Sequence, residues 1–239
     1  MSLFVDTSIR SDQTEIMDDF TLEGALFRDT LDKLETINRL LGGNGVTING
    51  IKKLIQDQPK DKKITIVDLG CGHGDILRDV AKLGREKGYK FQLIGIDANP
   101  DAIQYAEELS NDYPELSFQA IDIFSEDFQK LEFDVVLCTL FAHHFKNEEL
   151  ISFFKPTLKN AKLGIVVNDL HRHKLAYYLF KIIGLFVKNR MVREDGLTSI
   201  LRAFKKQDLE KLSKKLKAKA SIQWKWAFRY QWILTGESK

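Results

Sequence analysis

The sequence contains little cysteine and almost no excess of charge. Its 239 residues include two cysteines, Cys71 and Cys138, and 36 basic side chains nearly balance 34 acidic ones, for a formal net charge of +2. Two cysteines this far apart provide no disulfide framework, so we expect a reducing, cytoplasmic location. A charge this small does not by itself indicate a nucleic-acid or membrane partner.

The sequence contains no internal repeat and no low-complexity block. Residues 1–6 carry no basic region followed by an apolar one, so we expect no secretory signal. The apolar stretch at residues 175–187 has only about 13 residues, whereas roughly 20 are needed to cross a bilayer. We therefore expect no integral membrane segment, and we interpret this stretch as a buried helix that walls a pocket or forms the face of a homodimer.

The stretch at residues 67–75 organises the rest of the chain. An apolar run leads into Gly70, Gly72 and Gly74, and a helical pattern follows. Glycine lets the backbone pass close to a ligand, and a helix N-terminus offers free N–H groups. The spacing is G-x-G-x-G, whereas a dinucleotide loop has its third glycine one residue later. Asp68, two residues before the first glycine, would repel a pyrophosphate and suits a cationic ligand.

Apolar runs and helical patterns alternate beyond this loop. The runs predict strands near 64–69, 91–97, 116–121, 133–139 and 162–168, with helices near 75–87, 100–111 and 147–159. This alternation indicates βαβ units and a parallel sheet, in which ligands bind outside the carboxyl ends of the strands. Asp97 ends the second run about 20 residues beyond the glycine loop.

Four motifs in register resemble those of the class I S-adenosylmethionine-dependent methyltransferases, in their small-molecule (type 11/12-like) branch. They are the acid and glycines of the first loop, Asp97, Asp122 after the third strand, and the Phe133-Asp134-Val135-Val136 start of the fourth strand. The resemblance covers roughly residues 64–170. It implies a Rossmann-like, doubly wound α/β fold with a seven-stranded, mostly parallel sheet and an antiparallel last strand, its final hairpin near 219–235.

The same resemblance implies S-adenosylmethionine as the cofactor. The ribose would lie on Asp97 and the adenine edge near Asp122 and Ile123. The residues expected at the cofactor are Asp68, Gly70, Cys71, Gly72, Gly74, Asp97, Ala98, Asp122, Ile123, Cys138 and Thr139.

Residues 1–62 precede the first core strand and have helical patterns. Apolar residues recur at three- and four-residue steps from Leu22 to Leu41, the pattern stops at the glycine-rich residues 42–45, and a second short helix spans 48–55. We expect a helical cap over 1–62 and a methyltransferase domain over 63–239, with a substrate-shaping insertion at about 172–204.

The charged residues near the start of the cap allow two interpretations. Arg10, Glu15, Asp18 and Asp19 recur at near-helical spacing. They form either a solvated face or part of a cap that closes over the cofactor pocket, where Arg10 would contact the substrate.

The five histidines all follow expected strand ends. His73 follows the first strand, His143 and His144 the fourth, and His171 and His173 the fifth. Each alone could be a structural, hydrogen-bonded residue, but histidine also accepts a proton near neutral pH. We propose His144 and His171 as candidate bases, with His143 as the next candidate and Asp169 as an orienting acid.

The loops after the fourth and fifth strands narrow the chemistry. Residues 137–145 contain no proline, so they lack the signature of exocyclic-amine methyltransferases and the Pro-Cys pair of the pyrimidine-C5 type, and their hydrophobic-His-His pattern resembles small-molecule relatives. A metal site at His171 and His173 is disfavoured because their spacing does not place both on one helical face, so we predict no metal. The candidate acceptor-binding residues are Arg10, Asn168, Arg172 and Tyr177.

These observations predict a biosynthetic O-methyltransferase that acts on a small, largely apolar phenolic or quinol hydroxyl with a histidine base. The alternatives are C-methylation of a quinone-type ring, an RNA or protein methyltransferase, a non-catalytic cofactor-binding protein, and a nicotinamide oxidoreductase. Residues 200–239 hold eleven basic against three acidic residues and five alternating aromatics. Their leucine stripe and alternation indicate a solvated helix and a half-buried strand, so we expect no nucleic-acid partner.

Overall fold

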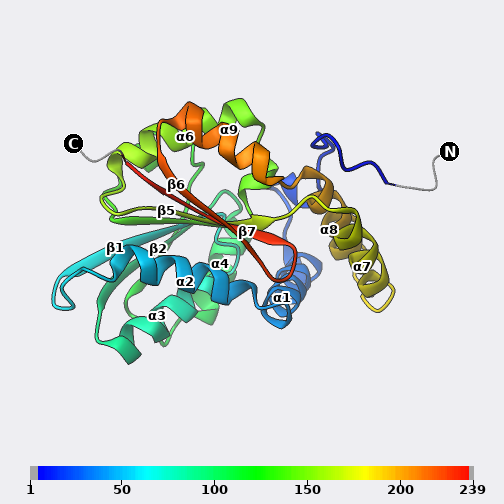
Figure 1. Ribbon diagram of the computed structural model, residues 1–239. Coiled ribbons are helices and arrows are strands. Elements are labelled where there is room, and N and C mark those ends of the chain that lie inside the picture. The colour runs from blue at the N-terminus through cyan, green and yellow to red at the C-terminus, as the bar shows by residue number, and fades with distance from the viewer. Residues whose placement is uncertain (1–4, 237–239) are drawn as a thin grey trace.

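The computed structural model describes residues 5–236 of the chain, and its centre is one seven-stranded sheet (Figure 1). The strand order is β3-β2-β1-β4-β5-β7-β6, in which β1 to β5 run parallel and β7 pairs antiparallel with β5 and β6. This confirms the predicted doubly wound fold with an antiparallel last strand. The strands are β1 (Lys63–Leu69), β2 (Lys90–Asp97), β3 (Leu116–Ala120), β4 (Val135–Thr139), β5 (Gly164–Leu170), β6 (Lys219–Lys225) and β7 (Arg229–Thr235).

Helices cover both faces of the sheet and one of its ends. In Figure 1, α6 and α9 lie above the sheet, α2 and α3 lie below it, and α1, α7 and α8 gather at the right-hand end. The helices are α1 (Gly24–Leu40), α2 (Gly43–Ile55), α3 (Asp75–Lys87), α4 (Pro100–Leu109), α5 (Glu126–Gln129), α6 (Asn147–Asn160), α7 (Lys174–Gly184), α8 (Arg190–Arg202) and α9 (Lys206–Leu216), with 3-10 turns η1 (Ile16–Asp18) and η2 (Ala142–His144).

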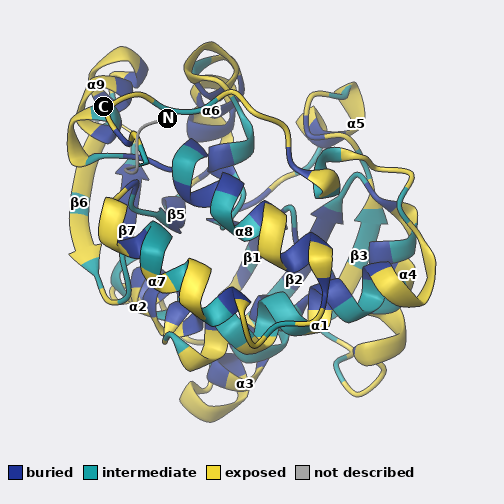
Figure 2. Ribbon diagram, turned by 90° about the vertical axis from the view of Figure 1, so that its right-hand side faces the viewer, coloured by how far each residue is buried: buried dark blue, intermediate teal, exposed yellow. Residues whose placement is uncertain are grey.

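The hydrophobic core has two layers because successive side chains of a strand point to opposite faces. In β1, Ile64 and Ile66 pack with α2 and α3, whereas Val67 and Leu69 belong to the cluster beneath α6 and α9. The dark blue residues of Figure 2 accordingly follow the strands and the inner sides of the helices. Burial on both faces explains why these strands are continuous apolar runs.

Helix α2 begins at Gly43, inside the glycine-rich stretch that was expected to separate two helices. Gly42 makes the turn with a positive φ of 73°, and the missing side chain of Gly43 leaves room for its neighbours. A Cβ on Gly43 would lie 1.8 Å from Asn38 Oδ1 and 2.4 Å from Arg229 Nη1. Although it lies within 1–62, α2 packs on the sheet, with Ile51 fully buried.

The expected insertion at 172–204 folds as the helix pair α7 and α8, which lies over the carboxyl ends of the parallel strands. The prediction of a buried helix at 175–187 is wrong, because only Ala176 and Gly184 of α7 are buried. The helix covers a cavity with one side and exposes another. Within residues 5–236, none of the helices combines the length and apolarity that crossing a membrane requires.

Candidate active site

A cavity of about 790 Å³ lies at the carboxyl ends of β1, β2, β4 and β5. The strands and the loops after them supply its floor, including Asp68, Asp97 and Thr139. Its other walls come from η1, α1, α7, α8 and the turn between β6 and β7, all of which gather at the same end of the molecule (Figure 1). The topology therefore places the cavity where parallel α/β sheets bind ligands.

The glycine loop after β1 forms one side of this cavity. Gly70 and Gly72 line it with positive φ values of 62° and 50°, and a Cβ on Gly70 would lie 2.2 Å from the ring of Phe141. Gly74 lies behind the loop, because a Cβ there would meet the Phe118 ring at 2.7 Å. Two of the three glycines thus expose backbone to the cavity, and the third allows close packing.

Carboxylates surround the glycine loop. Asp68 is 2% exposed, and its Oδ1 has no hydrogen-bond partner in the described part of the chain. Burial, together with the nearby Asp75 and Asp97, raises the pKa of Asp68 well above its ordinary value. Asp97 accepts hydrogen bonds from Gly72 N at 2.9 Å and Asn99 N at 3.0 Å, and burial raises its pKa. This end of the cavity suits a ligand with positive charge and hydroxyl groups.

A buried histidine and aspartate face each other across β4 and β5. His143 Nδ1 lies 2.7 Å from Asp169 Oδ1, and Asp169 Oδ2 accepts a hydrogen bond from the backbone N–H of His143 at 3.0 Å. Although burial opposes its ionisation, the hydrogen bonds that Asp169 accepts from His143 keep the pKa of Asp169 below its ordinary value. The contact assigns the imidazole proton to Nδ1, so that Nε2 keeps its lone pair.

His143 Nε2 faces the N-terminal segment, by which we mean residues 5–23, ahead of α1. It lies 3.6 Å from Glu15 Oε1, and both atoms are buried and lack a hydrogen-bond partner among residues 5–236. Ser199 Oγ donates to the other oxygen of Glu15 at 2.8 Å. Burial raises the pKa of Glu15 to about 7. Both residues line the cavity, so a polar group of a ligand can reach both at once.

His144 takes part in a separate ion pair at the rim of the cavity. Its Nδ1 lies 2.6 Å from Asp18 Oδ1, and Arg202 Nη1 lies 2.6 Å from Asp18 Oδ2. Despite burial, the hydrogen bonds from these two residues lower the pKa of Asp18. Both histidines thus have Nδ1 on a carboxylate, and what sets His143 apart is its buried Nε2, which has no hydrogen-bond partner among residues 5–236.

Glu15, His143 and His144 also offer potential metal-ligand atoms within 4.8 Å of one another, a grouping that the sequence interpretation did not contain. Arg202 Nη1 lies 3.6 Å from Glu15 Oε1 and already places positive charge beside that carboxylate. A divalent cation would have to compete with this guanidinium.

His171 lies outside the cavity. Strand β5 continues to Leu170, and His171 then bridges to Phe204. Its ring contacts His173 in a tilted arrangement and Tyr230 edge-on, with ring centroids 5.2 and 5.0 Å away. Burial lowers the pKa of His171 to about 4, so the ring is neutral at physiological pH. The candidate base at this position therefore has a packing role in the structure.

The four candidate acceptor-binding residues also lie outside the lining of the cavity. Arg10 donates to the carbonyls of His143, Phe145 and Arg202, and Arg172 donates to those of Thr7, Ser8 and Ala203. Asn168 Nδ2 donates to Gly43 O at 2.9 Å and Thr47 Oγ1 at 3.0 Å, and Tyr177 packs edge-on against Tyr178. The two arginines hold the N-terminal segment in place over the site.

Some of the expected cofactor residues line the cavity and others do not. Those that line the cavity are Asp68, Gly70, Cys71, Gly72, Asp97 and Thr139. Ile123 and Cys138 are buried in the core, Ala98 and Gly74 are not in the lining, and Asp122 is exposed and accepts a hydrogen bond from Phe124 N at 2.9 Å. Strand β3 ends at Ala120, and Asp122 opens the turn that follows it through the hydrogen bond from Phe124 N.

Comparisons with known proteins agree with this geometry. Residues 60–176 match the family model of a methyltransferase domain. This region of the chain thus has the sequence of a methyltransferase domain.

Solved structures share the fold of this chain at low sequence identity. The plantazolicin methyltransferase BpumL in complex with SAH superposes with a TM-score of 0.65 and 17% identity over 89% of each chain. Magnesium protoporphyrin IX methyltransferase (ChlM) from Synechocystis PCC 6803 with bound SAH gives a TM-score of 0.55 and 16% identity, over 83% of this chain and 84% of ChlM.

Two curated relatives align with part of this chain. Pavine N-methyltransferase of Thalictrum flavum subsp. glaucum is 26% identical over 121 residues, which is 49% of this chain and 32% of that protein. A protein of Invertebrate iridescent virus 6 is 34% identical over 73 residues, 30% of this chain and 24% of that protein. The chain thus spans about a quarter to a third of the length of these two relatives.

Proposed function

We propose that this chain transfers a methyl group from S-adenosylmethionine to a hydroxyl oxygen of a small, largely apolar acceptor, with His143 as the general base. The observation that carries the proposal is the buried, unpartnered Nε2 of His143. It lies in the same cavity as the acidic glycine loop, with Asp169 fixing the opposite side of its ring.

The glycine-loop end of the cavity fits the cofactor. The unpartnered Oδ1 of Asp68 would accept from the methionine ammonium, and Asp97 would hold the ribose hydroxyls beside Gly70 and Gly72. When bound, the cofactor supplies an electrophilic methyl group on a cationic sulfur. The negative charge of Asp68, Asp75 and Asp97 would stabilise that cation.

His143 and Glu15 would handle the acceptor's proton. Their facing atoms are 3.6 Å apart, so a hydroxyl at the edge of this gap would donate to His143 Nε2 and contact Glu15 Oε1. Below pH 7, the raised pKa keeps Glu15 protonated and able to donate back to the hydroxyl oxygen. A positioned base of this kind contributes typically 10²–10⁴-fold to the rate.

The remaining walls indicate the class of acceptor. Apolar side chains line the cavity from the N-terminal segment and from α7 and α8. Such walls exclude water and bind apolar rings or chains through burial of their surface. The apolar lining residues of the N-terminal segment, α1, α7 and α8 are Met17, Phe20, Phe27, Leu31, Leu34, Ile37, Ala176, Leu179, Phe180, Ile182, Ile183 and Ile200. The structural neighbours support a small acceptor, since their names refer to plantazolicin and magnesium protoporphyrin IX.

The decisive experiment compares His143→Gln with His171→Gln, which changes a histidine outside the cavity. Steady-state assays on a panel of small phenols should show kcat lowered by about 10²–10⁴-fold for His143→Gln and unchanged for His171→Gln. Calorimetry should show that both variants bind S-adenosylhomocysteine as the wild type does. Full activity of His143→Gln would refute the base, and a product methylated at carbon, seen by NMR, would refute the hydroxyl acceptor.

A further inference from the structure

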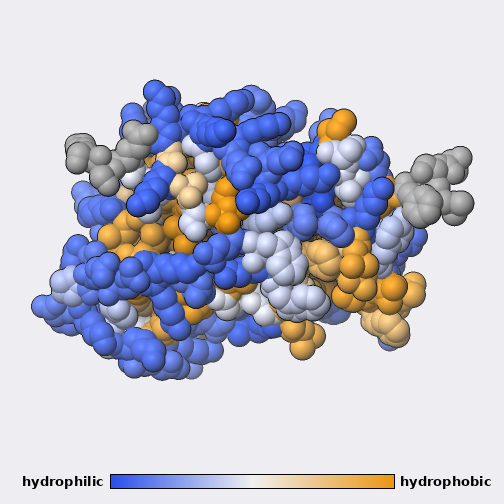
Figure 3. Space-filling view, in the orientation of Figure 1, coloured by the Kyte–Doolittle hydropathy of each residue, from blue (hydrophilic) through white to orange (hydrophobic). Residues whose placement is uncertain are grey.

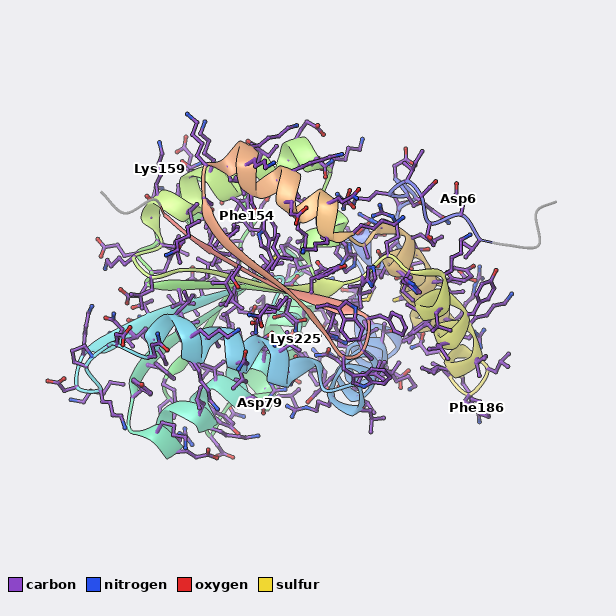
Figure 4. The ribbon with its side chains drawn as sticks, in the orientation of Figure 1. Asp6, Asp79, Phe154, Lys159, Phe186 and Lys225 are labelled. Atoms are coloured by element: carbon purple, nitrogen blue, oxygen red, sulfur yellow. The ribbon has the colours of Figure 1, made fainter. Side chains whose placement is uncertain are left out.

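Helix α7 exposes a continuous apolar face at the end of the molecule that holds the cavity. Leu175, Leu179, Ile182 and Phe186 recur at helical spacing, and all are exposed. At the turn after the helix, Leu185 is 79% and Phe186 is 85% exposed. Hydrophobic residues gather there in Figure 3, and Figure 4 shows Phe186 projecting from the tip of the turn. We name this surface, Leu175 to Phe186, the α7 face.

The α7 face is continuous with the mouth of the cavity. Leu179 and Ile182 are exposed and also line the cavity, so they belong to both surfaces. Phe20 and Trp226 are likewise both exposed and part of the lining. An apolar compound can therefore pass from the outer face to the inner wall without crossing a polar barrier at these positions.

Basic residues flank the α7 face. Residues 174–193 contain five lysines and arginines and no aspartate or glutamate. Lys174, Lys181 and Lys188 are exposed, and none of them forms an ion pair within residues 5–236. Lys174 and Lys181 are seven residues apart and so share one edge of the helix beside the apolar stripe. A helix with exposed leucine and phenylalanine beside lysine has the composition of an interfacial membrane helix.

We propose that the α7 face docks on the anionic surface of a lipid bilayer and that the acceptor is a membrane-dissolved amphiphile, which enters the cavity past Leu179 and Ile182. The class of acceptor rests on the proposed function, whereas the docking itself does not. The lysines would contact lipid phosphates while Leu185 and Phe186 insert between acyl chains. A second copy of the chain fits this surface less well, because it would bring Lys174, Lys181 and Lys188 against their own copies.

Vesicle sedimentation with the full chain tests the docking. We expect binding to phosphatidylcholine vesicles that contain about 30% phosphatidylglycerol, and weaker binding to pure phosphatidylcholine or at high salt. The double variant Leu185→Ser/Phe186→Ser should lower the bound fraction at least about tenfold. Lys181→Glu/Lys188→Glu should have a similar effect.

Matched controls lie on other helices, at Leu109 on α4 and Lys159 on α6, both of which are exposed. Leu109→Ser and Lys159→Glu should bind vesicles as the wild type does. Equal binding by the α7 variants and the controls would overturn the proposal. A second result would also overturn it: the wild-type chain does not bind vesicles and elutes as a dimer, and Leu185→Ser/Phe186→Ser dissociates that dimer. The α7 face would then be a dimer interface.

A second measurement separates this inference from the proposed function. Leu185 and Phe186 do not line the cavity, so their double variant should methylate a soluble short-chain phenol at the wild-type rate. It should be at least about tenfold slower on a long-chain phenol embedded in vesicles. Vesicle binding without methylation of any phenol would refute the proposed acceptor and leave the docking intact.

Discussion

Asp68 illustrates, at the scale of a single residue, how a binding site conflicts with stability. Its carboxyl is buried without a hydrogen-bond partner among the described residues, and burial and two other acids raise its pKa. Such a group destabilises the ligand-free fold and becomes favourable when a cation arrives. Proteins commonly carry unfavourable groups of this kind at functional sites.

The variant Asp68→Asn tests this conflict. It removes the buried charge and keeps the shape, so we expect an unchanged or higher Tm without ligand. The affinity for S-adenosylhomocysteine should fall at least about tenfold, because the ammonium loses its charged partner. Thermal unfolding with and without S-adenosylhomocysteine measures both effects. A lower Tm together with unchanged affinity would show that Asp68 is structural.

Glu15 predicts a specific dependence of stability on pH. Its pKa of about 7 in the folded chain exceeds the ordinary 4.5, so the native state binds the proton more tightly than the unfolded chain. The stabilisation is present below pH 4.5 and is lost as the pH rises through 7. Glu15→Gln should remove this loss, which amounts to about 3 kcal/mol at roughly 1.4 kcal/mol per pKa unit.

Urea unfolding of wild type and Glu15→Gln between pH 4.5 and pH 8 measures the effect. Glu194→Gln is the matched control, because Arg190 lowers the pKa of the exposed Glu194 and its replacement cannot remove a loss at high pH. Parallel pH curves for the wild type and Glu15→Gln would mean that Glu15 is ionised without cost in the folded chain.

At the scale of elements, the junction of α1 and α2 depends on the glycine at position 43. A Cβ there would have to displace Asn38 and the guanidinium of Arg229. These two groups are hydrogen-bonded to each other, since Arg229 Nη1 donates to Asn38 Oδ1. Gly43→Ala should therefore lower the free energy of unfolding by about 1–3 kcal/mol. Gly45→Ala, two residues on in the same helix, meets nothing within 4 Å and should raise it by about 0.5–1 kcal/mol. Urea unfolding decides the sign of each change, and equal signs would contradict the packing explanation.

Elements with local signals were predictable from the sequence. Helix α3 at 75–87 and the hairpin within 219–235 lie where the periodicity placed them, because each has its own turn or cap and an apolar stripe. The start of α2 was not predictable, since Gly43 is required by a contact with Arg229, which is far from it in sequence. The exposure of α7 was missed because an all-apolar helix gives no sign of which side lacks a partner.

The same division holds for the candidate site. Asp68, Gly70, Gly72 and Asp97 follow from motifs next to strand ends, and they line the cavity. Glu15 could not be assigned, because nothing near it in sequence indicates that it meets His143. From the sequence, Glu15 could be placed only in a segment that either is solvated or closes over the cofactor pocket, and the one contact assigned there was that of Arg10 with the substrate.

At the scale of the whole molecule, the acceptor side of the cavity depends on the N-terminal segment, which is not part of the sheet. Arg172 binds the carbonyls of Thr7 and Ser8, and Asp195 accepts from the backbone N–H groups of Ile16 and Met17 at 2.7 and 3.0 Å. The two large core clusters contain no residue of this segment among their members. The segment should therefore be separable from the fold.

Deletion of residues 1–19 tests that separation. The truncated chain should still unfold cooperatively, because the sheet and its core are intact, and should bind S-adenosylhomocysteine within about threefold of the full chain, because Asp68 and Asp97 remain. Its kcat/KM for a small phenol should fall more than about 100-fold, because Glu15 is lost and water enters the part of the cavity that binds the acceptor. Calorimetry, urea unfolding and steady-state kinetics measure these three properties separately. If affinity for S-adenosylhomocysteine and activity fall together, the segment also supports the cofactor site. The single variant Glu15→Gln would then show how much of the lost activity is due to the carboxyl group.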